Sequence, residues 1–365
     1  MKMRPGELAA AALIFLAACS ASTLVESPEL TAFEEVATVD TEISGEILPL
    51  DTDSCDGITQ AFSAFSDLVS VSYDDEFIYV NSPSGLPYTD PEDDYLKSMV
   101  GITGWILRVP IPYDYQWRIP VDPQWVEDYE EGSAKGPIAF AANGVPIFHY
   151  ERRPDVSTDP SNYEPGSDTV VQGELDQCGG HSGQGDDYHY HYVPICLLND
   201  MDISDPIAFG LDGVPIYFGT GGSDFFGSGL YSDLDNLPAS DLDECNAYQL
   251  EDSSYVYYTT KEPPYVIGCH RAHFDSSLQI EPRPLRGRDQ GSPGIYGGQV
   301  GEPIDTLITD FYIDVDGWFH LEHQAFDGAG TSAVIYRQSA EGDDCWDFEF
   351  REDVTVAGTL ETYCR

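Results

Sequence analysis

The sequence predicts a mainly β fold, a β-rich α+β protein in which a pseudo-symmetric β unit is duplicated and followed by a small C-terminal β domain. Three observations lead to this prediction. Short apolar runs alternate with turn residues along most of the chain, and no long segment has a convincing helical period. In addition, a unit of roughly 65 residues recurs once within the chain, which indicates an internal repeat.

The duplication rests on three pairs of similar segments that occur in the same order. The pairs are residues 136–147 with 205–216, 175–178 with 242–245, and 188–192 with 255–259. The offset is 69 for the first pair (205 minus 136) and 67 for the other two (242 minus 175 and 255 minus 188). Two copies, over about 136–200 and 205–270, are too few for a solenoid, so we expect a pair packed face to face.

Each copy opens with a hairpin signal. Asn143-Gly144 and Asp212-Gly213 lie between short apolar runs, and these dipeptides favour the tight turns of hairpins. Other runs of β character lie outside the repeat, at residues 69–73, 77–80, 105–109, 307–315, 318–322, 333–336 and 346–350. The last four runs predict the small β domain, which we place at residues 297–365.

The first residues predict export from the cytoplasm. A basic start leads into an apolar run that is too short to remain in a bilayer, so residues 1–18 are expected to be a signal peptide. Small residues precede Cys19, as in a lipobox, and we expect lipidation of Cys19, with residues 19–46 as an acidic tether. Ser20 favours the outer membrane. The predicted location is the cell envelope, as an outer membrane lipoprotein facing the periplasm or the surface, or the medium if the chain is secreted.

The charge of the chain limits its partners. The sequence has 65 acidic and 16 basic residues, a formal net charge of −49. Nucleic acid and anionic membrane surfaces are therefore excluded as electrostatic partners, and the lipid on Cys19 is the expected membrane contact. The acids are spread along the chain, which is typical of proteins from saline habitats. Weak binding of divalent cations is the alternative explanation.

The cysteines predict disulfides, because an exported chain meets an oxidising compartment. Without lipidated Cys19, seven of the eight cysteines remain, and Cys55 is expected to stay unpaired. Cys345 and Cys364 are neighbours near the end of the chain and are predicted to pair. The repeat predicts one disulfide in each copy, Cys178–Cys196 and Cys245–Cys269.

The segment Tyr188–His191 has the sequence YHYH and resembles the signature of the YHYH domain family. Other parts of the resemblance, which covers much of residues 68–275, are Gly85–Pro87, Asn143–Pro146, Gly179–His181, Asp212–Tyr217, Leu242–Cys245 and Pro264–Arg271. The chain departs from the family at His270, where a bulky apolar residue usually stands. The resemblance implies a YHYH-like domain, which we place at residues 47–296, and an extracytoplasmic setting. It implies no reaction.

The histidines of the motif are candidate metal ligands. His189 and His191 are two residues apart in a predicted strand, so both side chains project from one face, and their Cα atoms are expected to lie about 6.5 Å apart. The neighbouring tyrosines share the other face, where they are expected to pack in the core. The predicted ligands are His181, in a glycine-rich turn, His189, His191 and His149. Asp186 and Asp187 are expected to supply an oxygen ligand or to orient an imidazole.

The second copy lacks these histidines. His181, His189, His191 and His149 correspond to Tyr248, Val256, Tyr258 and Phe218. A unit that keeps its scaffold without the histidines indicates that they serve a function other than folding. The alternative is that they are half-buried polar residues satisfied by hydrogen bonds. His270 and His273 would approach the same place if the copies pack face to face, and surface positions for both are the alternative.

These observations give two hypotheses. The first is an extracytoplasmic lipoprotein with a YHYH-type domain that binds zinc or copper through histidines, as a metal carrier or a metalloenzyme. The sequence leaves open whether the chain is an enzyme and which substrate it has, because no motif of the common hydrolases or nucleotide enzymes is present. The second hypothesis is a non-catalytic acidic surface module that binds polymer or cations.

Overall fold

The computed structural model describes residues 55–87, 108–132, 136–151, 163–219 without 177 and 184, 242–285 without 281 and 284, 306–325 and 330–365. Strands account for 39% of the chain and helices for 6%, so the mainly β prediction is confirmed. The helical elements of these residues are short: α1 (Cys55–Gln60) and single turns at Ser63–Phe65, Ile195–Asn199 and Ser276–Leu278. No helix in the described ranges is long and apolar enough to span a membrane.

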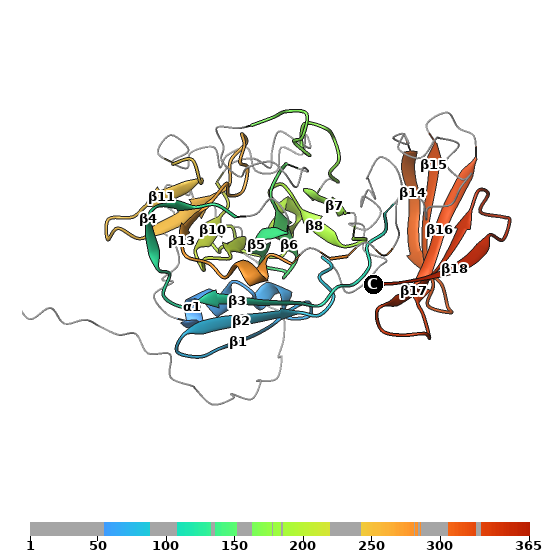
Figure 1. The fold of residues 1–365 in the computed structure, drawn as a ribbon, viewed down its shortest axis with the longest axis horizontal. Coiled ribbons are helices and arrows are strands. Elements are labelled where there is room, and N and C mark those ends of the chain that lie inside the picture. Colours follow the sequence, from blue (N-terminus) through green and yellow to red (C-terminus); the bar gives the residue numbers. More distant parts are fainter. Residues whose placement is uncertain are drawn as a thin grey trace, which may run out of the picture.

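An eight-stranded sheet forms the centre of the molecule (Figure 1). Its strands are β5 (Pro137–Ala141), β6 (Pro146–Phe148), β7 (Gly180–Ser182), β8 (Tyr188–Tyr190), β9 (Ala208–Gly210), β10 (Pro215–Tyr217), β11 (Ala247–Gln249) and β12 (Tyr255–Tyr258). Their order in the sheet is β11-β12-β10-β9-β5-β6-β8-β7. Read outward from the β9–β5 junction, the two halves have the same order of strands.

The two halves meet in the sheet through β5 and β9, which pair antiparallel. Phe140 pairs with Phe209, Ala139 with Gly210 and Ala141 with Ala208. Because 140 and 209 differ by 69, this is the pairing that two equivalent strands make around a local two-fold axis. The expectation that the copies pack face to face is wrong: they lie edge to edge in one sheet, where the pairing satisfies the main-chain groups of both edges. The pseudo-symmetry itself stays a prediction.

Both predicted hairpins are present. β5 pairs with β6 across Asn143-Gly144, and β9 pairs with β10 across Asp212-Gly213. Gly144 has φ +82° and Gly213 φ +86°, a conformation that glycine adopts without strain. A Cβ at Gly144 would also lie 2.4 Å from a methyl of Val69, so this turn packs closely on the next layer.

A second layer packs below the central sheet (Figure 1). It is the three-stranded sheet of β1 (Ser70–Tyr73), β2 (Phe77–Ser82) and β3 (Tyr115–Pro120); nearby, β4 (Trp125–Glu130) pairs with β13 (His270–Ala272). Trp117 of β3 stacks on Phe140 of β5 at 5.0 Å between ring centres, so aromatic rings join the two layers. The predicted strand at 105–109 is absent where described, at Arg108 and Val109, and residues 105–107 lie outside the description.

The C-terminal residues form a separate five-stranded antiparallel sheet. Its strands, in chain order and in sheet order, are β14 (Thr306–Ile313), β15 (Phe319–Ala325), β16 (Thr331–Gln338), β17 (Cys345–Arg351) and β18 (Thr359–Cys364). The sheet stands beside the β7–β8 end of the central sheet (Figure 1). The Tyr336 hydroxyl donates to the Pro110 carbonyl at 3.2 Å, so side chains connect the two parts. The domain boundaries predicted at residues 18, 46 and 296 lie outside the described residues and stay predictions.

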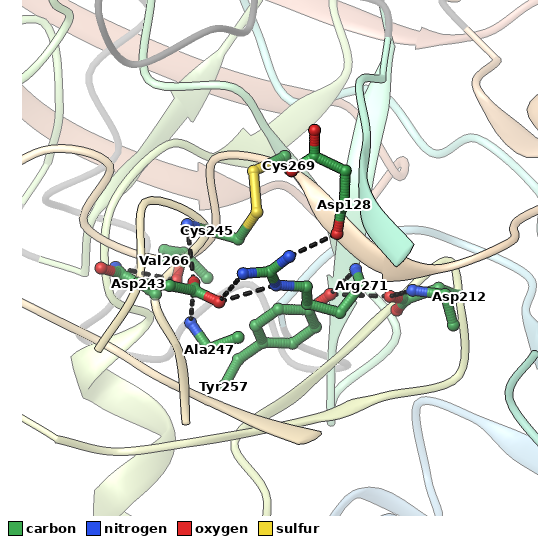
Figure 2. The surroundings of a disulfide bond; sticks show 11 residues. Asp128, Asp212, Asp243, Cys245, Ala247, Tyr257, Val266, Cys269 and Arg271 are labelled. Carbon is green, nitrogen blue, oxygen red and sulfur yellow. Dashed lines mark hydrogen bonds and ion pairs between the residues drawn. A yellow bond between two sulfur atoms is a disulfide. The ribbon is translucent and has the colours of Figure 1, made fainter. Parts of the chain in front are cut away.

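Three disulfides are present among the described residues: Cys178–Cys196, Cys245–Cys269 and Cys345–Cys364. These are the pairs expected from the sequence. Figure 2 shows the second, beside which Arg271 binds the Asp243 carboxylate, with its Nε at 2.7 Å, and the main-chain oxygen of Asp128. Cys19 and the side chain of Cys55 lie outside what the structure describes.

Candidate metal centre

The YHYH segment places tyrosines and histidines on opposite faces of the central sheet. Tyr188 and Tyr190 of β8 are 1% and 0% exposed and belong to the main core. His189 projects from the other face, directly across from His181 of β7, with which it is paired in register. His191 follows on the same face as His189, because side chains alternate along extended chain.

The three imidazoles form a compact cluster. One ligand nitrogen from each of His181, His189 and His191 lies within 4.8 Å of the other two. The ring centres are 4.8–5.0 Å apart, and the ring planes are inclined to one another by 76–85°. With Zn–N bonds of about 2.0–2.1 Å and tetrahedral angles, three imidazole centres lie about 5 Å apart. The spacing of the ring centres therefore fits three histidine ligands, and the ligand nitrogens, within 4.8 Å of one another, would approach to about 3.3 Å around a tetrahedral ion.

Hydrogen bonds at Nδ1 set the tautomer of each ring. His181 Nδ1 lies 3.2 Å from the Glu174 carbonyl, and His191 Nδ1 lies 2.5 Å from the His149 carbonyl. Because a carbonyl oxygen only accepts, both Nδ1 atoms carry the proton. His189 Nδ1 lies 2.9 Å from Asp187 Oδ2, a carboxylate that accepts in the same way. In the neutral, Nδ1-protonated form of each ring, Nε2 has a free lone pair, as a metal ligand requires.

Burial favours the neutral form of His181 and His191. Burial, together with the charge on His189, lowers the pKa of His181 to about 3. Burial and the neighbouring histidines hold the pKa of His191 well below its ordinary value. Burial would raise the pKa of the Asp187 carboxyl, but its contact with His189 outweighs burial and lowers that pKa. At neutral pH, His181 and His191 are uncharged beside an ionised Asp187.

Close packing holds the ring of His189. Phe148 stacks on it at 4.1 Å between ring centres, with the planes 8° apart. On the opposite strand, a Cβ at Gly183 would lie 2.2 Å from His189 Cε1. Only glycine at position 183 leaves room for the ring in this position. The sequence indicated a flexible glycine-rich turn here, but a single sequence contains no signal that pairs Gly183 with His189.

The turn between β7 and β8 is fixed by bonds to distant segments. Gly183 and Asp187 pair through the Gly183 amide and the Asp187 carbonyl at 2.8 Å. Asp186 is fully buried and forms a 3.2 Å ion pair with Arg108. Of the two aspartates expected to assist the metal, Asp187 orients His189, and Asp186 instead anchors the turn.

The other predicted histidines lie outside the cluster. The His149 carbonyl holds His191, but the His149 imidazole is not among the three rings that converge. His270 donates from Nε2 to the Ile138 carbonyl at 2.8 Å. His273 is exposed, and its Nδ1 lies 2.7 Å from Glu130 Oε2. Because the copies lie edge to edge, neither His270 nor His273 reaches the first copy's histidines.

The corresponding place in the second copy is apolar. β11 pairs with β12 in the register Tyr248–Val256, which is the His181–His189 register displaced by 67 residues. There, Tyr217, Val256 and Tyr258 form a small cluster of their own, with Leu242, Tyr248 and Leu250 packed against it. The same strand pair therefore forms with an apolar cluster in one half of the sheet and with histidines in the other.

Comparison with known families agrees with this arrangement. Residues 116–272 match the model of the family described as YHYH protein. The chain contains a YHYH domain. The match begins in β3 and ends in β13, so the YHYH domain includes the whole central sheet and all three histidines of the cluster. Searches of curated proteins and of solved structures give no match.

Proposed function

We propose that this YHYH-domain protein binds one transition-metal ion through Nε2 of His181, His189 and His191. The observation that carries the proposal is the arrangement of the three Nδ1 atoms. Each is bonded to a fixed oxygen, so the neutral form of each ring has its lone pair on Nε2. A cluster that served only the core would not need three imidazoles held in this way, and the second copy has an apolar cluster there.

The chemistry of the ligand set supports zinc or copper. Imidazole nitrogen suits both ions, whereas calcium and magnesium prefer oxygen ligands. Three protein ligands leave a fourth position for water or a substrate group, which is the arrangement of catalytic zinc sites. We propose a metal carrier or a metalloenzyme, with His189 held by Asp187 in the manner of a carboxylate–histidine pair that orients a metal ligand.

The proposed setting is the cell envelope. The three disulfides suit an oxidising compartment. We propose further that residues 1–18 direct export and that Cys19 carries the lipid that anchors the chain, on the basis of the lipobox-like sequence. Mass spectrometry of Cys19 after expression in a bacterial envelope tests the anchor separately from the metal.

The test of metal binding is elemental analysis of the protein without residues 1–19, purified without a chelator or a His-tag. We expect about one zinc or copper per chain and loss of that metal in the His189→Ala/His191→Ala variant. The matched control is His273→Ala, which removes an exposed imidazole outside the cluster and should keep the metal. Wild-type protein that takes up no metal after incubation with zinc and copper would overturn the proposal and leave the acidic binding module as the better hypothesis.

A further inference from the structure

One disulfide encloses the whole histidine cluster. Cys178 precedes β7, Cys196 follows β8, and the 18-residue separation between them contains all three histidines. The loop is closed at its other end by the turn at residues 183–187. The proposed ligands therefore lie on a hairpin that is closed at one end by main-chain bonds and at the other by a covalent bond.

Main-chain hydrogen bonds connect the residue next to the disulfide with one of the histidines. Gly179, next to Cys178, accepts hydrogen bonds from the amides of His191 and Tyr192 at 3.0 and 3.1 Å. Gly180 pairs with Tyr190, one residue before the His181–His189 pair. Opening the disulfide removes the covalent constraint at the end of the hairpin where His191 leaves the sheet.

This disulfide is also more accessible than its counterpart in the second copy. Cys245 and Cys269 are 0% and 1% exposed. Cys178 is 4% exposed, and Cys196 is only partly buried. Both cysteines line a cavity of about 30 Å³, together with Asp176 and the exposed Asp200. The cavity has room for about two water molecules. A thiolate that attacks Cys196 needs to reach only one sulfur.

We propose that Cys178–Cys196 is a redox-sensitive lock on the metal centre, which holds the three histidines together when oxidised and lowers metal affinity when reduced. A dithiol reductant of the envelope would open it by thiol–disulfide exchange. One reductant thiolate attacks Cys196, the Cys178 thiolate leaves, and the second reductant thiol then resolves the mixed disulfide. Two protein thiols and one reductant disulfide result, and the thiol protons pass to the two cysteines. This inference rests on the proposed metal site and adds its regulation.

The direct test compares zinc affinity in two double variants. Cys178→Ser/Cys196→Ser removes the lock without creating thiols that would themselves bind zinc, and Cys345→Ser/Cys364→Ser removes a disulfide in the C-terminal sheet. Competition with a chromogenic chelator measures the dissociation constant of each. Closing a loop of this size restricts the chain strongly. We therefore expect zinc affinity to be at least tenfold weaker, about 1.4 kcal/mol, in Cys178→Ser/Cys196→Ser and unchanged in Cys345→Ser/Cys364→Ser.

A second measurement does not depend on how well the variant folds. Wild-type protein, metal-free or loaded with zinc, is treated with tris(2-carboxyethyl)phosphine, a reductant that has no thiol to compete for zinc, and free cysteines are alkylated and located by peptide mass spectrometry. Reciprocity between metal binding and disulfide closure predicts slower reduction of Cys178–Cys196 in the loaded protein and an unchanged rate for Cys345–Cys364. Equal affinity in a folded variant, or equal reduction rates with and without zinc, would overturn the lock. Wild-type protein that binds no zinc would instead overturn the metal site itself.

Discussion

At the scale of single residues, hydrogen bonds to fixed oxygens orient the three rings of the cluster. Glu174 and His149 contribute main-chain oxygens and Asp187 a carboxylate, so three different segments fix three rings. A main-chain oxygen cannot be removed by substitution, which makes the orientation of His181 and His191 insensitive to side-chain changes around them. His189 is different, because its orientation depends on Asp187, Phe148 and the space above Gly183.

Replacing Gly183 by alanine is expected to weaken metal binding. The new Cβ would lie 2.2 Å from His189 Cε1, so the ring must turn away from the other two. We expect roughly 10–100-fold weaker zinc binding, the range for displaced metal-site contacts, measured by chelator competition. Gly166→Ala is the matched control, since a Cβ there has no neighbour within 4 Å. Unchanged affinity in Gly183→Ala would show that the ring of His189 is not a ligand.

The stability of the metal-free protein should depend on pH below neutrality. The folded-state pKa of His181 is about 3, and the ordinary value is 6.5, so the unfolded chain binds more protons between these values. The contribution of His181 to the free energy of unfolding is therefore fully present above pH 6.5 and is lost as the pH drops towards 3. Between pH 7 and 5 we expect a loss of about 2 kcal/mol from His181, with a further loss from His191. Urea unfolding with a chelator present, compared between the wild type and His181→Asn, separates this loss from the opposite contribution of buried Asp176, whose pKa is raised to about 7. Equal profiles for the two proteins would contradict the burial of His181.

At the scale of elements, the β7–β8 and β11–β12 pairs are two versions of one strand pair. Their registers differ by 67 residues throughout, and one encloses histidines where the other has apolar and aromatic side chains. Burying charged or polar groups costs stability, whereas burying apolar side chains adds it. The first copy therefore has less apolar packing at this position and has three candidate metal ligands there instead.

Transplanting the second copy's residues into the first should preserve the fold and abolish metal binding. The variant His181→Tyr/His189→Val/His191→Tyr is expected to keep the Cys178–Cys196 disulfide and a circular dichroism spectrum like that of the wild type. Room for the larger rings comes from the same face that accommodates Tyr248 and Tyr258 in the second copy. Elemental analysis should find no bound zinc or copper. A variant that fails to fold would show that the histidines are needed for the core of the first copy.

The parts of the fold that the sequence predicts are local. Asn143-Gly144 and Asp212-Gly213 predict hairpins because the turn conformation is decided by those residues, and alternation along the strand separates His189 from Tyr188 and Tyr190. The joining of the copies through β5 and β9 could not be predicted, since both faces and edges of two short hairpins are apolar. The same holds for His149: its neighbour Phe148 stacks on His189, and only tertiary structure shows that its carbonyl, rather than its ring, serves the site.

At the scale of the whole molecule, the C-terminal sheet reaches the turn that carries Asp187. Arg365, one residue after β18, donates from Nη2 to the Gly185 carbonyl at 2.7 Å, and its guanidinium lies over the ring of Tyr113 at 5.0 Å. Its charge is one of the causes that lower the pKa of Asp187. The five-stranded sheet therefore contributes to the electrostatics of a site on another sheet.

Removing the Arg365 side chain should weaken metal binding without unfolding the YHYH domain. Arg365→Ala loses the bond to Gly185 and the charge near Asp187, and we expect an affinity loss of up to about tenfold, with part of it restored in Arg365→Lys. Arg337→Ala is the control, because it removes the same charge from β16, where Arg337 lies over Trp318 at 4.1 Å. Equal zinc affinities for the two alanine variants would mean that only net charge matters.

The connectivity of the disulfides bears on how the chain can mature. In the described residues each disulfide joins cysteines that are consecutive in the chain, at separations of 18, 24 and 19 residues. No loop of one crosses a loop of another. From Cys178 onward, an oxidase that links cysteines in the order in which they emerge from a translocation pore would thus produce these pairs, whereas Cys55 emerges earlier and would have to be passed over. We therefore expect a Cys55→Ser variant to need an oxidant but no disulfide shuffling, so that deletion of an isomerase would leave its yield of correctly bonded protein unchanged.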